Sequence, residues 1–208
     1  MKDGSRQEGQ TSLRKGEATH TRILGEAARL ASVRGLSAVS LADVAGPAGL
    51  SKSGLFKHFE SKEAMHRQVL DLSWDRFEAF IWTPSLDAAP GRPRLETVFD
   101  RWIGWGTDER PEGGCPINAM AMELDDQPGP LREAMRERQF AWRSKLVEEF
   151  KRLREPPVSD EEAWQAVFEM KGFVLVLGEA SRLLEDGRAK DQARRAMAGL
   201  LDRIEQGS

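Results

Sequence analysis

Residues 48–59 read Ala-Gly-Leu-Ser-Lys-Ser-Gly-Leu-Phe-Lys-His-Phe, and this stretch decides the fold of the N-terminal quarter of the chain. Gly49 can end one helix, and Ser51 can cap the start of another that runs to about His58. Two short helices joined by a three- or four-residue turn with a glycine are typical of a helix-turn-helix. The second helix of this motif enters the major groove of DNA. The stretch therefore predicts a recognition helix over residues 51–58.

Two further helices are expected before this stretch. Apolar residues at helical spacing predict the first of them: Ile23, Ala27, Leu30 and Ala31. Gly35 can end this helix, and Ser40 followed by Asp43 fits a capping box at the start of the next. Pro47 falls inside the expected second helix, where it cannot donate to the Asp43 carbonyl. We therefore expect this second helix, which runs to Gly49, to be bent.

Residues 21–62 resemble the N-terminal domain of TetR-type transcriptional regulators, on residues 48–59 and the Ser61-Lys62-Glu63 that follows. The resemblance implies an all-α fold. Residues 13–60 would form a three-helix helix-turn-helix DNA-binding domain, and residues 61–208 a helical bundle for effector binding and dimerisation. Residues 1–12 are polar and are expected to be a disordered arm. The family usually has Tyr where Phe56 stands, so a phenolic contact to a phosphate is absent.

The start of the recognition helix is expected to meet the base edges, through Lys52, Ser53 and Gly54. Lys52 is the expected donor to a guanine or a phosphate, and Gly54 lets the backbone approach. The other residues placed at the DNA surface are Ser40, Ser51, Phe56, Lys57, His58 and Lys62. Their alternatives stay open: Phe56 can pack inside, Lys57 can be an ordinary surface lysine, and His58 can be a structural histidine.

Charge is divided unevenly between the two parts of the chain. Residues 1–66 hold 10 Lys and Arg against 7 Asp and Glu, whereas the whole chain has a net charge of −3. A mildly basic N-terminal part on an acidic remainder is consistent with DNA binding at one end only. Ordinary solvated surfaces could produce the same small difference.

The remainder of the chain reads as helices separated by Pro and Gly. The expected spans are 61–82 (ended by Thr83-Pro84), about 95–106, 117–124, 131–153, 159–184 and 193–204. Residues 173–177 are apolar on all sides, which predicts a helix buried on two faces. The last helix has one apolar stripe, from Ala193 to Ile204. Together these two helices predict a homodimer through a four-helix interface, as the resemblance also implies. The alternative is that the pair completes the core of a single chain.

Bulky side chains in the segments broken by Gly and Pro could line an apolar cavity, the usual form of a small-molecule site. The expected ligand-binding residues are Trp102, Trp105, Cys115, Met120, Phe140, Trp142 and Phe168. The alternative is a well-filled core. The resemblance implies an unidentified small effector at this place, and the shortage of polar groups favours a hydrophobic one.

Other function classes find little support in the sequence. His20, His58 and His66 lack metal-ligand spacing, Cys115 has no His partner in sequence, and no glycine-rich phosphate loop follows a strand. We therefore expect no enzyme, no metal and no cofactor. Residues 123–126 (Glu-Leu-Asp-Asp) are interpreted as a surface patch rather than a cation site. Cys115 is interpreted as a loop or cavity thiol, with a redox sensor as the alternative.

Location follows from the same sequence. A single Cys fits a reducing compartment, and no run of eighteen apolar residues occurs. The polar first dozen residues do not form a secretory signal. We expect a cytoplasmic protein without a membrane span.

The sequence thus predicts a repressor that binds a palindromic double-stranded DNA operator as a dimer and is released by a small effector. One alternative is an activator, or a regulator that answers to a protein partner or to thiol oxidation. Another is a helical enzyme that has kept a helix-turn-helix as a scaffold.

Overall fold

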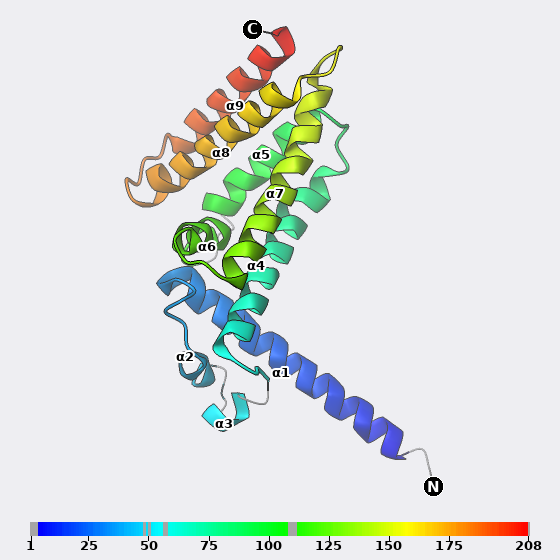
Figure 1. Ribbon diagram of the computed structural model, residues 1–208, viewed down its shortest axis with the longest axis vertical. Coiled ribbons are helices and arrows are strands. Elements are labelled where there is room, and N and C mark those ends of the chain that lie inside the picture. Colours follow the sequence, from blue (N-terminus) through cyan, green and yellow to red (C-terminus); the bar gives the residue numbers. More distant parts are fainter. Residues whose placement is uncertain (1–3, 48, 50, 56–57, 108–111, 208) are drawn as a thin grey trace.

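The computed structural model describes residues 4–47, 49, 51–55, 58–107 and 112–207, and for residues 4–15, 52 and 53 the backbone alone. All regular structure in these residues is helical, which confirms the all-α fold class. Helices α1, α2 and α3 form a small head, and α5 to α9 form a larger body (Figure 1). Helix α4 runs from the head into the body, so the two parts share one continuous helix.

The head contains α1 (Gly4–Arg34), α2 (Leu41–Ala45) and α3 (Lys52–Leu55). The expected apolar stripe of α1 faces inward, where Ile23 and Ala27 are fully buried. Gly35 has a φ of 86°, so it ends α1 in the left-handed conformation that glycine tolerates. Ser40 and Asp43 form the expected capping box at the start of α2. These local signals are confirmed.

Two boundaries in the head differ from the sequence-based expectation. The backbone from Gly4 onward is helical and continuous with α1, whereas residues 1–12 were expected to be disordered; no proline interrupts this stretch. Helix α2 ends at Ala45, and Pro47 lies in the turn after it rather than inside a bent helix. Proline lacks the N–H that would continue the helix, so the helix stops before it. The expected end of α3 near His58 involves residues 56–57, which lie outside the described residues.

Helix α4 (Lys62–Ser85) continues through Pro84, where the sequence predicted a stop after Trp82. A proline removes the hydrogen bond to the carbonyl four residues earlier, here that of Phe80. The Arg101 guanidinium donates to the Phe80 oxygen instead, at 2.9 Å. Because this arginine replaces the missing donor, the helix keeps its last turn.

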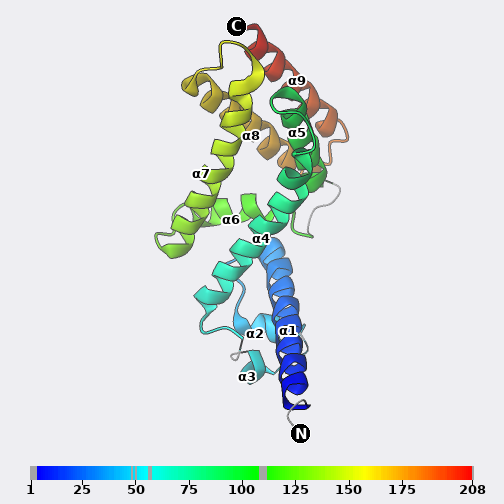
Figure 2. The same cartoon turned by 90° about the vertical axis from the view of Figure 1, so that its right-hand side faces the viewer.

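The body also contains α5 (Arg92–Thr107), α6 (Pro116–Leu124), α7 (Pro130–Phe150), a 3-10 turn (Lys151–Leu153), α8 (Asp160–Arg182) and α9 (Ala189–Gln206). Ser61 and Ser159 cap α4 and α8 through their hydroxyl groups. Helices α8 and α9 run side by side along one face of the body. Figure 2 shows α6 lying across the junction between head and body. No described helix is both long and apolar enough to cross a membrane.

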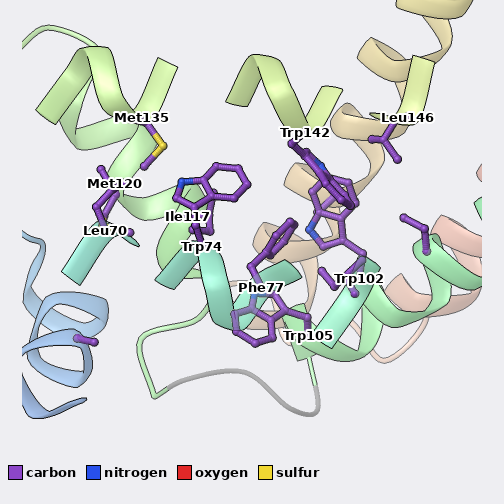
Figure 3. Close-up of a cluster of buried hydrophobic side chains, with 14 of the residues drawn as sticks. Leu70, Trp74, Phe77, Trp102, Trp105, Ile117, Met120, Met135, Trp142 and Leu146 are labelled. Carbon is purple, nitrogen blue, oxygen red and sulfur yellow. The ribbon is translucent and has the colours of Figure 1, made fainter. Parts of the chain in front are cut away.

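An aromatic cluster fills the centre of the body (Figure 3). The Phe77 ring lies 5.4 Å from that of Trp74 and 5.1 Å from that of Trp142, both edge to face. The Trp102 ring lies 5.4 Å from that of Trp142 in the same geometry. Edge-to-face pairs add to the hydrophobic gain of burying such large side chains. This cluster joins α4, α5 and α7 into one core.

The apolar stripe of α9 belongs to this single-chain core. Leu200 is 1% exposed, and Met197, Leu201 and Ile204 are also buried within the chain. The prediction that this stripe forms the dimer interface is therefore wrong, and the alternative holds for these residues. Helix α9 has only one apolar side, and this side packs against the body, so the stripe faces inward.

Candidate nucleic-acid interface and effector cavity

The helix-turn-helix is formed by α2, the turn after it and α3. The Ser51 hydroxyl accepts a hydrogen bond from the Gly54 backbone at 3.1 Å, which caps α3 as expected. Leu55 of α3 and Phe59 after it are buried, and the Phe59 ring lies 4.8 Å from that of His20 on α1. The expected contacts Phe56 and Lys57, and the side chains of Lys52 and Ser53, lie outside the described residues.

The other expected DNA contacts have partners within the head. The Ser40 hydroxyl bonds the Asp43 carboxylate, and this hydrogen bond lowers the pKa of Asp43. His58 is half-buried, with its ring centroid 6.0 Å from that of His20. Lys62 is exposed, and its ammonium group donates to the Ser37 carbonyl at 2.6 Å. Ser40 and Lys62 thus form hydrogen bonds within the head, and His58 packs near His20, whatever else these residues contact.

A carboxylate on α6 joins the body to the head. Glu123 accepts hydrogen bonds from the backbone nitrogens of Leu36 and Ser37, at 2.6 and 2.5 Å, in the loop between α1 and α2. Burial raises the pKa of Glu123, but the hydrogen bonds from Ser37 and Leu36 prevail and hold it below its ordinary value. The residue expected in a surface patch is thus a junction residue.

A buried histidine lies beside this junction. The His66 ring on α4 lies 2.8 Å from the Val39 carbonyl oxygen in the same loop. Burial lowers the pKa of His66, which favours the neutral ring. A neutral imidazole can donate one hydrogen bond to the carbonyl, so His66 fixes the other end of the loop.

The segment before α6 also touches the head. Glu112 forms an ion pair with Arg29 on α1 at 2.6 Å. Gly113 lies so close to α1 that the Cβ of any other residue would lie 1.5 Å from the Ser32 carbonyl oxygen. Gly114 has a φ of 90° and packs against the Arg182 guanidinium. Glycine at 113 therefore allows the direct contact between this segment and α1.

The same segment forms one wall of a cavity of about 220 Å³. Helices α5, α6 and α8 supply the other walls. The lining consists of Trp102, Gly106, Gly113, Cys115, Asn118, Ala119, Met122, Val174, Leu175, Leu177, Gly178 and Arg182. A mostly apolar cavity with a few polar groups is typical of small-molecule sites, although this one is smaller than the roughly 300–1,000 Å³ usual for drug-sized ligands.

A partly buried lysine lies beside this cavity. Lys171 on α8 donates to the Asn118 side-chain oxygen at 2.8 Å, and its ammonium group lies 5.2 Å from the centre of the Trp102 ring. Burial is the main cause that lowers the pKa of Lys171 to about 8. The nearby Arg143 charge lowers this pKa further, whereas Cys115 raises it. A positive charge therefore lies behind two of the lining residues, Asn118 and Trp102.

The expected ligand residues are not brought together as a set. Trp102 and Cys115 line the cavity. Trp105, Met120 and Trp142 belong to the closed core, and Phe140 and Phe168 are exposed on α7 and α8. The sequence analysis missed Asn118, Met122, Lys171 and Arg182. A usable signal was present for Lys171, a charge directly beside the apolar run 173–177.

The described residues contain no group of three or more His, Cys, Asp or Glu side chains placed to hold a metal ion. The acidic residues expected to form a surface patch include Asp125 and Asp126, and both are exposed at the end of α6. To a ligand the cavity offers apolar walls, hydrogen-bond donors and a positive charge.

Several solved structures share this fold. A TetR-family transcriptional regulator from Streptomyces coelicolor is 17% identical, with a TM-score of 0.76, covering 90% of this chain and 96% of that one. A TetR transcriptional regulator from Chloroflexus aurantiacus is 27% identical, with a TM-score of 0.70 and coverage of 93% and 97%. AibR, solved with isovaleryl coenzyme A and operator DNA, is 24% identical, with a TM-score of 0.70 and coverage of 88% and 97%.

Two sequence families match the chain, while no curated protein matches it in sequence. Residues 23–69 match the bacterial regulatory proteins of the tetR family. Residues 91–197, half of the chain, match the tetracyclin repressor-like C-terminal domain. The chain therefore belongs to the tetR family of bacterial transcriptional regulators.

Proposed function

We propose that this regulator is a repressor that binds a palindromic operator as a homodimer and leaves it when a small effector enters the body cavity. The observation that carries the proposal is the continuous contact between the cavity wall and the head. Gly113 lines the cavity and packs against Ser32 on α1. A ligand that moves this wall must also move α1, and with it the helix-turn-helix.

The α6 junction supports the same route. Asn118 lines the cavity, and Glu123, in the same helix, bonds the loop before α2. A ligand shifts the equilibrium between two states only if its affinity for them differs. We infer that the effector favours a position of α6 and residues 112–115 in which the two heads no longer fit neighbouring half-sites.

A second copy of the chain is the expected occupant of the outer face of α8. This face has exposed apolar side chains, including Trp164, Phe168 and Val176, with Phe168 68% exposed. Beside them lies a groove of about 260 Å³ between α8 and α9, lined in part by Gly172, Ala180 and Ala196. Protruding apolar groups and a groove on the same pair of helices suit an isologous two-fold interface.

The regulator is tested with duplex DNA that flanks its own gene. Fluorescence anisotropy would measure the dissociation constant for this duplex and for a scrambled duplex at one fixed salt concentration, because phosphate contacts make affinity salt-dependent. We expect two chains per duplex and a strong preference for the flanking sequence. Equal affinity for both duplexes would contradict sequence-specific regulation.

A further inference from the structure

Among the described residues, the effector cavity carries positive charge without a matching carboxylate. Its described lining contains Arg182, an exposed arginine at the cavity mouth, but no Asp or Glu. Lys171 contacts the lining residues Asn118 and Trp102, and Arg143 is near enough to Lys171 to help lower its pKa. Other half-buried cations of the body do have acidic partners, such as Arg94 with Glu149 at 2.9 Å. Among the described residues, Lys171, Arg143 and Arg182 have no ion-pair partner.

The hydrogen-bond donors at this end of the cavity are free. A lysine ammonium can only donate, so its contact with Asn118 assigns the accepting atom as the side-chain oxygen and leaves the Asn118 amide N–H groups available. Among the described residues the buried indole N–H of Trp102 has no acceptor, which is also true of the core residues Trp74, Trp105 and Trp142. Trp102 differs from those three because it lines the cavity. A buried donor without an acceptor is costly, and an acceptor atom of a ligand in the cavity would satisfy this one.

We propose that the effector is a small carboxylic acid with an apolar body, bound as its anion; this proposal rests on the proposed function. Arg182, the Asn118 amide and the Trp102 indole donate to the carboxylate, and Lys171 supplies further positive charge from behind Asn118. Charge-assisted hydrogen bonds of this kind are stronger than neutral ones, above all where water is excluded. The anion satisfies these donors and offsets the positive charges of Lys171 and Arg182 at once.

The rest of the lining selects the remainder of the molecule. Met122, Val174, Leu175 and Leu177 offer only apolar surface, whereas a second charged group would meet no partner. The cavity volume of about 220 Å³ lies below the range usual for drug-sized ligands. This space suits a short aliphatic or single-ring acid.

The test uses hexanoate and benzoate as probes, each with its neutral amide, and hexylamine as the cationic match. Isothermal titration calorimetry on the full-length protein would measure each affinity. We expect one or both acids to bind and the amides and hexylamine to bind at least tenfold more weakly. Equal binding of acid and amide, preference for the amine, or no binding of either acid overturns the carboxylate assignment.

Two variants locate the anion site. Arg182→Gln and Lys171→Met should each weaken binding of the acid at least tenfold while leaving the thermal unfolding midpoint close to that of the wild type. Arg136→Gln removes a positive charge from the exposed surface of α7 and is the matched control, with unchanged binding expected. If Arg182→Gln and Lys171→Met bind the acid as the control does, the site is elsewhere and the proposal fails.

A third variant guards against misfolding. Asn118→Asp keeps the size of the side chain and places a carboxylate beside Lys171, so it should fold and yet repel the acid. Retained acid binding by this variant contradicts the proposal. Operator binding is measured separately: an acid that binds without changing operator affinity refutes ligand-released repression but keeps the anion site, whereas operator binding without acid binding refutes only the anion site.

Discussion

The Glu123 carboxylate lies 2.6 Å from the backbone nitrogen of Leu36, and this hydrogen bond links α6 of the body to the loop that precedes the helix-turn-helix. A second hydrogen bond from Ser37 completes the contact. A side chain that accepts from two consecutive backbone N–H groups holds the loop in one position. The geometry makes Glu123 the residue through which a shift of α6 reaches the head.

Replacing this carboxylate should loosen the junction. In Glu123→Gln one of the two accepting oxygens is replaced by an NH₂ group, so one of the two backbone hydrogen bonds is lost together with the negative charge. We expect a loss of about 1.5–3 kcal/mol in the free energy of unfolding, the usual range for hydrogen bonds to charged groups. Urea denaturation followed by circular dichroism measures it. An unchanged midpoint would show that the contact contributes nothing to stability.

The junction should also respond to pH through His66. Burial lowers the pKa of His66 below its ordinary value of 6.5, so the folded state favours the neutral ring. Stability from this group is therefore full above pH 6.5 and is lost as the pH falls through the folded pKa. We expect the urea midpoint to drop between pH 7.5 and pH 5, and to drop less in His66→Gln. Equal drops in the two proteins would exclude His66 as the cause.

Gly113 should tolerate no larger residue. In Gly113→Ala the added Cβ meets the Ser32 carbonyl, so the segment or α1 must move apart. We expect a cost of about 1–3 kcal/mol, as for other overpacked sites, together with a weaker operator response to effector. Gly199→Ala is the control, because nothing lies near the Cβ position of this helical glycine. If the two variants have the same stability and the same operator response to effector, residues 112–115 do not transmit the signal from the cavity to the head.

The dimer prediction distinguishes the outer face of α8 from the inner face of α9. Phe168→Glu places a charge on the exposed face and should give a folded monomer with weak operator binding. Leu200→Glu buries an unpaired carboxylate in the core and should unfold the chain instead. Sedimentation velocity and thermal unfolding would measure both. A Phe168→Glu protein that stays dimeric would move the interface elsewhere.

Effector binding should weaken in alkaline solution. The pKa of Lys171 is lowered to about 8 in the empty cavity, and a bound anion raises it by favouring the charged form. Affinity for the acid should be steady below pH 8 and fall above it. At higher pH the Lys171 amine is neutral and must take up a proton before it can attract the acid. Calorimetric titrations between pH 6.5 and pH 9.5 would measure the trend. Affinity that is constant up to pH 9.5 would remove Lys171 from recognition.

Local signals in the sequence predicted the helices well because their causes are local. The caps at Ser40 and Ser159 depend on side chains and backbone within one turn. The stop expected at Pro84 failed because its missing donor is replaced by Arg101, from another helix. The local sequence around Pro84 contains no information about that contact.

The cavity was harder to predict than the helices. Helical periodicity indicates that Trp102, Trp105 and Trp142 are buried, but not which of them faces a cavity and which faces the core. That distinction depends on how α5 is rotated against α6 and α8. The strongest clue in the sequence was Lys171, a charged residue next to an apolar run of α8. The sequence does not show which group offsets this charge, because in the proposal that group belongs to the ligand.

The most direct test of the account is the affinity of the wild-type protein for duplex DNA flanking its own gene, compared with scrambled DNA, at one salt concentration. The account predicts two chains per duplex and binding of the flanking sequence at least about a thousandfold tighter than of the scrambled one. Binding of both duplexes with the same affinity, or of neither, would contradict it.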